Sequence, residues 1–446
     1  MEISSVIYFF DSFFITVVAF ILCLSIIVFV HEFGHYFIGK LSGIHAEVFS
    51  IGFGPVLLSR YDKNGTKWQI AAFPLGGFVK FLGEGKLSSS KHSELNSKID
   101  SDFKRRTMQG SPLWARFITV AAGPIFNFIF SGIIFFCIFL GQGTTQLPVT
   151  VANLFELPYN FALRKGDVVL SINGVNISEE LENISPSQKS ALSNSPAFYV
   201  IERAGNVLEL NEIIQNPPRI SQVLPKSAAI SAGLEAGDVI LSINSEQIDN
   251  FDQIKAFVEA SDGKAINLEY WRNGSVQYTS LTPLIVDVPD PEGGFERIFR
   301  IGIVGGLFPF EPVTKRQPFG EAIFNSFDSI YSIMAGSING LYHILFGNIS
   351  SCNLSGPLAI AETSGQMAKQ GGLDYLWFIA VLSTAIGMIN LFPIPVLDGG
   401  HLMFFTCEAV LGKQLNPKII NGFMTFGFLI LIILMSFALF NDFFCP

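Results

Sequence analysis

The residues best suited to chemistry form the run His31-Glu32-Phe33-Gly34-His35, an HExxH pattern. On a helix, positions i and i+4 lie on one face, so both imidazoles can bind one metal ion. Zinc is the usual metal for this pattern, with Zn–N distances of about 2.0–2.1 Å. Glu32 follows the first ligand directly and is expected to serve as general base for a zinc-bound water. The pattern predicts one catalytic Zn²⁺ per chain.

The pattern lies at the end of an uncharged stretch, Ser12 to Val30. Ionisable residues at the end of a membrane helix are costly unless they have a function. The alternative is a helix end whose polar groups reach the lipid headgroups, but such ends more often use Lys or Arg. The position therefore favours a metal site within a membrane.

A catalytic zinc keeps three protein ligands and one open position. The acidic residue beside a later apolar stretch is Asp398, in the run Asn390-Leu-Phe-Pro-Ile-Pro-Val-Leu-Asp398-Gly-Gly-His401. Its prolines and glycines interrupt the helix, and irregular backbone at membrane depth is tolerated where it lines protein or a watery cavity. We expect Asp398 to be the third ligand. His401 is either an outer partner, an oxyanion donor or an interfacial histidine, and is not assigned to the metal.

The composition indicates a membrane protein. The chain has 446 residues, of which 49% are hydrophobic and 15% charged, against about 25% charged in soluble domains. A net charge of −9 argues against nucleic acid as a partner. Four uncharged stretches are each near the roughly 20 residues needed to cross a bilayer: Ser12–Val30, Phe117–Leu140, Tyr375–Leu397 and Ile419–Phe440. The first lacks the basic start of a signal peptide, so we expect it to be retained.

Basic residues predict the orientation of these helices. Lys and Arg gather in residues 40–106, and Lys413 and Lys418 lie between the last two stretches. Both segments should be cytoplasmic, which places residues 141–374 outside. We expect 329–347 to be an amphipathic helix on the outer surface. If it crossed the membrane, Asp398 would lie on the opposite side from the HExxH residues.

The segment between the second and third stretches contains a repeat. Gly166–Asn173 recurs as Gly237–Asn244, an offset of 237 − 166 = 71 residues. The second copy continues into an expected helix, 251–260, and two expected strands, 265–271 and 276–281. The residues 221–248 resemble the core of PDZ domains, which bind peptides by adding a strand to a sheet edge. The two copies either bind peptides in this way or act only as steric spacers.

The five cysteines show no CxxC spacing, and three lie in or beside apolar stretches. We expect free thiols, with neither a disulfide framework nor a Cys-ligated metal.

Two glycine-punctuated runs, 48–60 and 67–82, predict strands between the first two membrane helices. We expect a hairpin that dips into the membrane, with the edge at Gly76 and Gly77 pairing with an unwound substrate. The alternative is a cytoplasmic hairpin that only packs under the helices.

Three motifs carry a family resemblance: HEFGH (31–35), AAGPIFNFIF (121–130) and NLFPIPVLDGG (390–400). Together they resemble the site-2 protease family of intramembrane zinc metalloproteases. The paired PDZ-like copies and FPLGGFVKFLGE (73–84) resemble its bacterial regulator-of-sigma-E branch.

The resemblance implies zinc held by the two histidines and Asp398, with Glu32 as acid–base and Asn390 and Pro393 contacting the substrate. It implies a bacterial inner-membrane protein of the envelope stress response, with periplasmic PDZ domains and an active site toward the cytoplasm. The implied substrates are single-span membrane proteins, such as a trimmed anti-sigma factor, and remnant signal peptides.

The sequence thus predicts a multi-pass α-helical membrane protein with four transmembrane helices, a membrane-associated β-hairpin and two extracytoplasmic PDZ-like α/β domains. The expected function is intramembrane proteolysis, in which Glu32 assists attack of zinc-bound water on the peptide bond. A membrane zinc transporter and a PDZ scaffold are the alternatives. The expected segments are 1–40 (first helix with HExxH), 41–113 (cytoplasmic or re-entrant β region), 114–140 (second helix), 146–215 and 216–286 (PDZ-like domains), 287–372 (C-terminal PDZ region with amphipathic helices), 373–401 (third helix with the LDG motif) and 418–441 (fourth helix).

Overall fold

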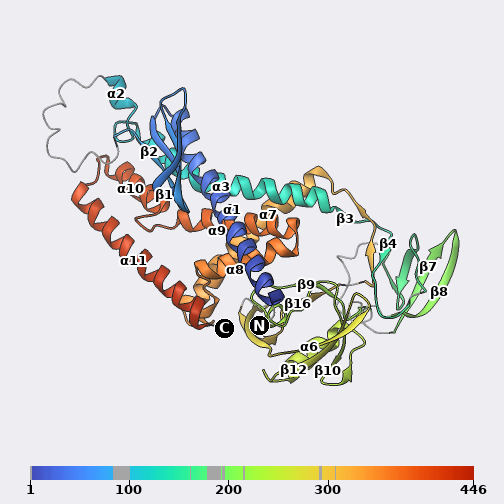
Figure 1. Ribbon diagram of the computed structural model, residues 1–446. Helices are drawn as coiled ribbons and strands as arrows, with labels where there is room; N and C mark the ends of the chain where they lie inside the picture. Colours follow the sequence, from blue (N-terminus) through green and yellow to red (C-terminus); the bar gives the residue numbers. More distant parts are fainter. Residues whose placement is uncertain are drawn as a thin grey trace. The chain divides into compact units, whose positions relative to one another are not determined.

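The computed structural model describes residues 3–83, 101–160, 162–177, 192, 196–213, 216–290, 294–306 and 308–445. They form two compact units. The first unit comprises Met1–Ile138, Gly320–Phe346 and Ser351–Cys445, and is mainly helical. The second comprises Phe139–Phe319 with Gly347–Ser350, and is built mainly from short strands (Figure 1). Within the expected PDZ-like domain 146–215, most of 178–195 lies outside the described residues, and so does 84–100 of the expected β region 41–113.

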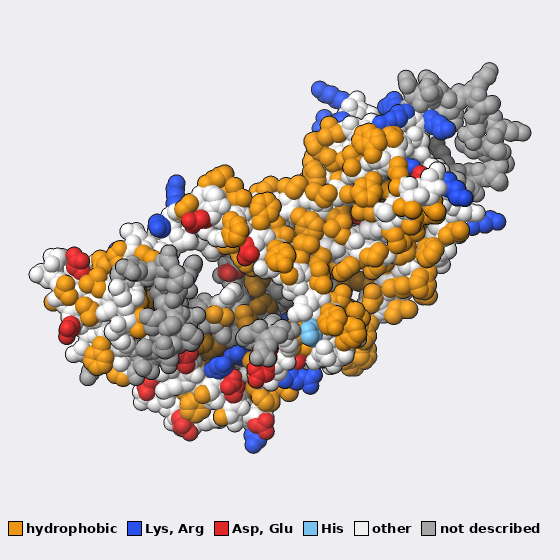
Figure 2. All heavy atoms as spheres, turned by 180° about the vertical axis from the view of Figure 1, so that it is seen from behind, with side chains coloured by type: hydrophobic (Ala, Val, Ile, Leu, Met, Phe, Trp, Pro, Cys, Tyr) orange, Lys and Arg blue, Asp and Glu red, His pale blue; other side chains and the backbone are white. Residues whose placement is uncertain are grey.

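Among the described residues, four helices are long and apolar enough to cross a membrane. They are α1 (Ile3–Leu41), α3 (Leu113–Gln142), α9 (Gly372–Leu391) and α11 (Pro417–Phe444). Hydrophobic side chains cover much of the first unit's surface in Figure 2, whereas acidic side chains gather on the second. An apolar surface of this extent requires lipid or protein as its surroundings. The helix α7 (Phe319–Leu345) is not among the four.

The third span breaks before the predicted ligand. Helix α9 ends at Leu391, a turn containing Pro393 and Pro395 follows, and α10 (Asp398–Leu411) begins on the acidic residue itself. A Cβ at Gly399 would lie 2.3 Å from the Leu391 carbonyl oxygen. Glycine is therefore required for the start of α10 to pack against the turn. The predicted interruption is present, and it divides the expected segment 373–401 into two helices.

The predicted hairpin consists of β1 (Ala46–Tyr61) and β2 (Lys67–Phe81), and both strands lie where the sequence predicts them. Their pairing is double, because 46–51 pairs with 77–81 on one side and with 67–70 on the other. Within the described part of the chain, 77–81 has no second strand partner. It therefore forms an open edge.

This sheet is fixed to the helix that carries the HExxH residues. The Tyr36 hydroxyl donates to the Asp62 carboxylate at 3.0 Å, and Trp68 Nε1 donates to it at 3.4 Å. The rings of Phe49 and Trp68 stack with centroids 4.2 Å apart. Partial burial alone would raise the pKa of Asp62, but these donors and the Thr66 backbone N–H lower it to about 2. Asp62 is thus ionised at neutral pH and holds the turn of the hairpin on α1.

The carboxyl end of α11 holds α8 (Pro357–Gln370) in place. The Asp442 carboxylate accepts the backbone N–H groups of Gly356 at 2.8 Å and Leu358 at 3.0 Å. These are unpaired donors at a helix N-terminus, where a negative charge is stabilising. Helix α8 in turn packs against α1, so closely that a Cβ at Gly365 would collide with Thr16.

A disulfide joins Cys352 and Cys445, 93 residues apart in the sequence. The expectation of free thiols is therefore wrong for this pair. The Asn441 side chain donates to the Ser351 carbonyl at 2.7 Å, which brings the two cysteines together. The remaining cysteines, Cys23, Cys137 and Cys407, are free as expected.

The second unit contains two four-stranded sheets with the same order, β6-β5-β7-β8 and β11-β10-β12-β13. The two copies of the repeated sequence therefore form sheets with the same order of strands. The first sheet consists of β5 (Val168–Ile172), β6 (Val175–Asn176), β7 (Ala197–Arg203) and β8 (Asn206–Ile213). The second consists of β10 (Val239–Ile243), β11 (Glu246–Gln247), β12 (Ile266–Arg272) and β13 (Ser275–Leu281), with α6 (Phe251–Ala260) between β11 and β12.

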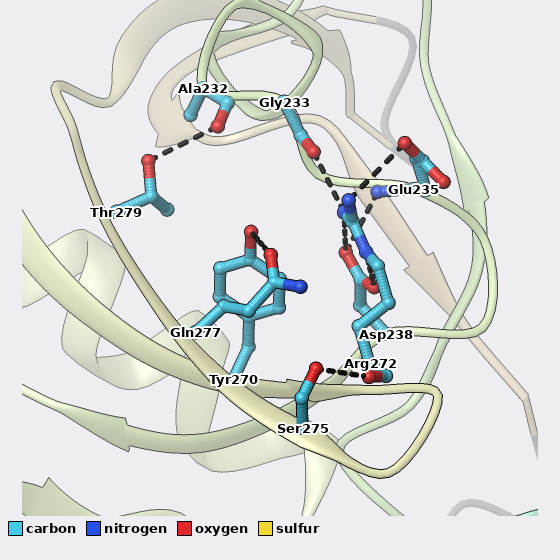
Figure 3. A network of polar contacts seen from close by, with 9 residues as sticks. All are labelled: Ala232, Gly233, Glu235, Asp238, Tyr270, Arg272, Ser275, Gln277 and Thr279. Atoms are coloured by element: carbon cyan, nitrogen blue, oxygen red, sulfur yellow. Dashed lines mark hydrogen bonds and ion pairs between the residues drawn. The ribbon is translucent and has the colours of Figure 1, made fainter.

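Both copies contain the same ion pair, in which the carboxylate is buried and the arginine is partly exposed. Asp238 accepts from Arg272 at 2.6 and 2.7 Å, and Arg272 also donates to the Gly233 carbonyl (Figure 3). In the other copy, Asp167 accepts from Arg203 at 2.7 Å. The Asp238 carboxylate raises the pKa of Arg272 above its ordinary value. The acid of the repeated Gly-Asp pair therefore anchors the start of one strand to the end of another.

Two strands that follow the second copy in the sequence pair with strands that precede the two sheets. Strand β9 (Ile220–Val223) pairs with β16 (Ile303–Gly305), and β4 (Val151–Leu154) pairs with β17 (Phe310–Pro312). Phe310 is buried with the core of the first copy, and Ile303 packs on the core of the second. The remaining described elements are α2 (Ser101–Arg105), β3 (Thr144–Thr145), α5 (Ala228–Ser231), β14 (Leu284–Pro289), β15 (Phe295–Arg300), β18 (Thr314–Lys315) and the 3₁₀ helix η2 (Ser351–Asn353).

Candidate metal centre

The HExxH residues lie within α1, whose helix continues to Leu41. One helical turn separates His31 from His35, so their Nε2 atoms lie 3.2 Å apart. His35 is buried, and His31 and Glu32 are partly buried. Both ligand candidates thus leave one helix on the same side.

Asp398 reaches the same point from the first residue of α10. Its Oδ2 lies 3.0 Å from His31 Nε2 and 3.4 Å from His35 Nε2. Four ligands around zinc, at about 2.0–2.1 Å each, are about 3.3–3.4 Å from one another. The spacing of these three atoms fits a zinc ion with one position left open. Two imidazole nitrogens and one carboxylate oxygen are also a common ligand set for zinc.

A cleft of roughly 250 Å³ opens beside these atoms. Its lining consists of His31, Glu32, His35, Gly77, Phe78, Val79, Phe81, Met108, Val120, Asn390, Val396, Leu397, Asp398, His401 and Phe405. The open edge of the hairpin, 77–81, thus forms one wall of the cleft, and the start of α10 forms another.

The structure brings some of the other predicted site residues to this cleft. Asn390 and Gly77 line it, and a Cβ at Gly77 would lie 2.9 Å from Glu32 Cγ. Gly76 packs against the ring of Phe53 instead, and neither it nor Pro393 is part of the lining. The sequence alone could not show that Gly77 and Asn390 face the cleft while Gly76 and Pro393 do not. The direction that a residue of a strand or turn faces depends on how the segment packs.

His401 also lines the cleft, three residues beyond Asp398. Its imidazole offers two ring nitrogens for hydrogen bonds within the cleft.

The sequence did not single out three residues of α3 that surround the histidines. His35 Nδ1 lies 2.9 Å from the Thr119 carbonyl oxygen, and His31 Nδ1 lies 3.3 Å from the Asn127 side chain. Gly123 lies between these two positions and against both imidazoles. The Gly-Pro pair inside an apolar stretch was a signal, since such residues mark close helix packing in membranes.

Replacement of Gly123 by alanine should abolish zinc binding. A Cβ there would lie 2.3 Å from His35 Nε2 and 2.9 Å from His31 Cε1, so the imidazoles must move from their present positions. Zinc content of the purified protein measures the effect. Gly132→Ala on the same helix is the matched control, since its Cβ would meet only Ile330, at 3.5 Å. Equal zinc content in both variants would contradict this account.

A buried ion pair fixes α10 to α3. Arg116 donates to both carboxylate oxygens of Glu408, at 3.0 and 2.6 Å, and its guanidinium lies 5.2 Å from the Phe405 ring centroid. Such two-pronged contacts restrict orientation more than a single bond does. Because α10 begins at Asp398, this pair limits how far that carboxylate can move.

The sequence has clear relatives. It matches the description "Peptidase family M50" over residues 19–434. A protein of Rhizobium meliloti named as a zinc metalloprotease is 32% identical over 431 residues, which cover 96% of each chain. The Regulator of sigma E protease of Salmonella typhi is 31% identical over 455 residues, covering 95% of this chain and 97% of that protein. A PDZ domain from Listeria monocytogenes is structurally similar over 20% of this chain and 87% of that one, but a TM-score of 0.17 at 16% identity supports no conclusion.

Proposed function

The chain belongs to peptidase family M50, and on this premise we propose that it cleaves membrane proteins at a zinc centre formed by His31, His35 and Asp398. It is a metalloendopeptidase with zinc as its cofactor. The convergence of two imidazoles and one carboxylate within 3.0–3.4 Å carries the proposal. The membrane-length helix α1 supplies both histidines, and the membrane-length helix α9 ends shortly before Asp398.

The proposed chemistry divides between the metal and this chain's residues. Zinc supplies a Lewis acid that makes water nucleophilic at neutral pH. Glu32 accepts the proton that the attacking water loses, and then returns it to the leaving amide nitrogen. The carbon–oxygen bond forms, the carbon–nitrogen bond breaks, and Glu32 ends in its original state. Asn390 and His401 line the same cleft and can donate hydrogen bonds to the substrate backbone.

We propose that the open edge 77–81 binds the substrate as an added strand. A helical substrate hides its peptide bonds in intrahelical hydrogen bonds, so it must unwind before water can attack. In this edge, Gly77 to Lys80 pair with β1 on one side only, and Phe78, Val79 and Phe81 line the cleft beside Glu32. The Val79 backbone N–H bonds to the Glu32 carboxylate, so the edge lies directly against the catalytic group. Pairing with this edge would hold the unwound segment extended next to the catalytic carboxylate.

Proline placed singly at Phe78, Val79 and Lys80 tests the edge. Successive backbone N–H groups of a strand point to opposite sides, so the three positions should not respond alike. Where the N–H faces the cleft, cleavage should fall at least about tenfold, the loss of at least one hydrogen bond of roughly 1.4 kcal/mol, with zinc content unchanged. At Val79 the fall should be larger, because its N–H also bonds to Glu32. Where the N–H pairs with β1, the thermal unfolding temperature should fall instead. Normal cleavage by all three variants would refute strand addition.

The substrates follow from the position of the site and from the relatives. Those proteins include regulators of sigma-E, which supports single-span anti-sigma factors as substrates. Remnant signal peptides are of the same physical class, one apolar helix with short flanks. We propose a bacterial inner membrane as the location, with the second unit in the periplasm and its two copies acting as PDZ-like domains.

Two observations support this orientation. Basic residues gather between α1 and α3, as is typical of cytoplasmic segments. The Cys352–Cys445 disulfide is at the carboxyl end of α11, and disulfides persist in oxidising compartments such as the periplasm. With four spans, both observations support a cytoplasmic position for the HExxH end of α1.

Reconstitution into lipid vesicles tests the function. A single-span substrate should be cut within or beside its apolar segment, cleavage should stop with a zinc chelator, and added zinc should restore it. Mass spectrometry of the products gives the cut position. Zinc transport across the vesicle membrane without any cleavage would favour a transporter, and peptide binding by the second unit without cleavage would favour a scaffold.

A further inference from the structure

The outer nitrogens of the two histidines have different partners. An imidazole that binds a metal through Nε2 carries its proton on Nδ1, and that N–H needs an acceptor to fix the ring. For His35 the acceptor is the Thr119 carbonyl oxygen, at 2.9 Å. For His31 the group at this position is the side-chain amide of Asn127, at 3.3 Å. The main chain thus serves one ligand, and a side chain serves the other.

Asn127 is held firmly beside His31. Its side chain is fully buried, and its backbone carbonyl accepts the hydroxyl groups of Ser131 at 2.9 Å and Ser383 at 3.1 Å. Gly387 of α9 packs directly against it, since a Cβ there would lie 3.2 Å from Asn127 Cβ. These contacts fix α3 to α9 at the depth of the metal ligands.

The amide has an orphaned oxygen. Asn127 Oδ1 is buried with no hydrogen-bond partner, while Nδ2 faces His31 Nδ1. If His31 binds metal through Nε2, this orientation places two donors opposite each other. Amide oxygen and nitrogen are nearly equivalent in shape, so a half-turn of the amide exchanges them. The turned amide places Oδ1 where it accepts the Nδ1–H of His31.

We propose that Asn127 is a positioning residue, whose side-chain oxygen accepts the Nδ1–H of His31 and thereby aims Nε2 at the zinc. The inference rests on the proposed metal centre and adds its outer partner. A buried amide in a membrane helix without such a role would leave a polar group unpaired in apolar surroundings, which is costly. The residue does not touch the substrate, so its effect on cleavage passes through His31.

Zinc affinity of the purified full-length protein tests this, measured by competition with a chromophoric chelator. Asn127→Leu keeps the approximate size but removes the acceptor, and should weaken zinc binding by about 10- to 100-fold. Asn127→Asp keeps an acceptor oxygen and should stay within a few-fold of wild type. Ser326→Ala, which removes a buried hydroxyl on α7 that bonds to the Ala322 carbonyl, is the matched control and should not change affinity. With cobalt in place of zinc, the visible spectrum should change in Asn127→Leu but not in Asn127→Asp.

Wild-type affinity in Asn127→Leu would overturn the inference. So would equal loss in Asn127→Leu and Asn127→Asp, since that pattern indicates packing. If Asn127→Leu does not accumulate, Asn127→Ala takes its place, compared with Asn127→Asp in the same way. A wild-type protein that binds no zinc would instead overturn the proposed metal centre.

Discussion

Replacement of Glu32 by glutamine is expected to reduce cleavage by at least about 10³-fold while zinc content stays at one ion per chain. Glutamine has nearly the same shape but cannot accept the proton that attacking water must lose. Glu32 lines the cleft but is not one of the three atoms that converge on the metal position. Binding and catalysis should therefore separate in this variant. The measurement is metal analysis beside the initial rate of cleavage of a single-span substrate.

Glu47→Gln is a suitable control for that experiment. Glu47 lies on β1 and pairs with Lys80 at 2.7 Å at the sheet surface, and it does not line the cleft. Its removal should change cleavage only slightly, because ion pairs of this exposure contribute little. A Glu32→Gln protein that cuts at the wild-type rate would remove Glu32 from the mechanism.

Replacement of Asp398 by asparagine is expected to have the largest effect on the metal. The amide lacks the charge that balances zinc, and it is a weaker ligand than a carboxylate. The loss of affinity should exceed the about 10- to 100-fold typical of losing an outer partner, and cleavage should fall with it. Excess zinc should restore part of the activity, which distinguishes this variant from Glu32→Gln.

Asp374→Asn provides the comparison. Asp374 lies in the first turn of α9, at the opposite end of that helix from the break before Asp398. It should bind zinc as wild type does. Unaltered zinc affinity in Asp398→Asn would exclude the carboxylate as a ligand and leave the two histidines without their third partner.

The local parts of this site could be predicted because they depend on short spacing. Positions 31 and 35 share a face in any helix, and uncharged stretches near 20 residues identify spans without knowledge of neighbours. Asp398 could be inferred because few acids lie beside the later spans. Gly123 and Asn127 could not, because their roles depend on how closely α3 approaches α1.

Pairing between segments that are distant in the sequence was also difficult to predict. The strands of the hairpin were predictable, but not the double register of 46–51, which depends on a reversal near Gly52 and Gly54, both with positive φ. The Cys352–Cys445 bond was missed because spacing alone does not determine which cysteines meet. By contrast, the duplicated sheets were predictable, since the sequence itself repeats.

Residues 441–445 hold two other segments of the first unit in place. Asn441 binds the Ser351 carbonyl, Asp442 neutralises the start of α8, and Cys445 is covalently joined to Cys352. Helix α8 packs against the amino-terminal half of α1. Residues 441–445 are therefore connected to α1 through contacts with one intervening helix. An epitope tag fused after Phe444, or a truncation there, would therefore perturb the very helix that bears the HExxH residues.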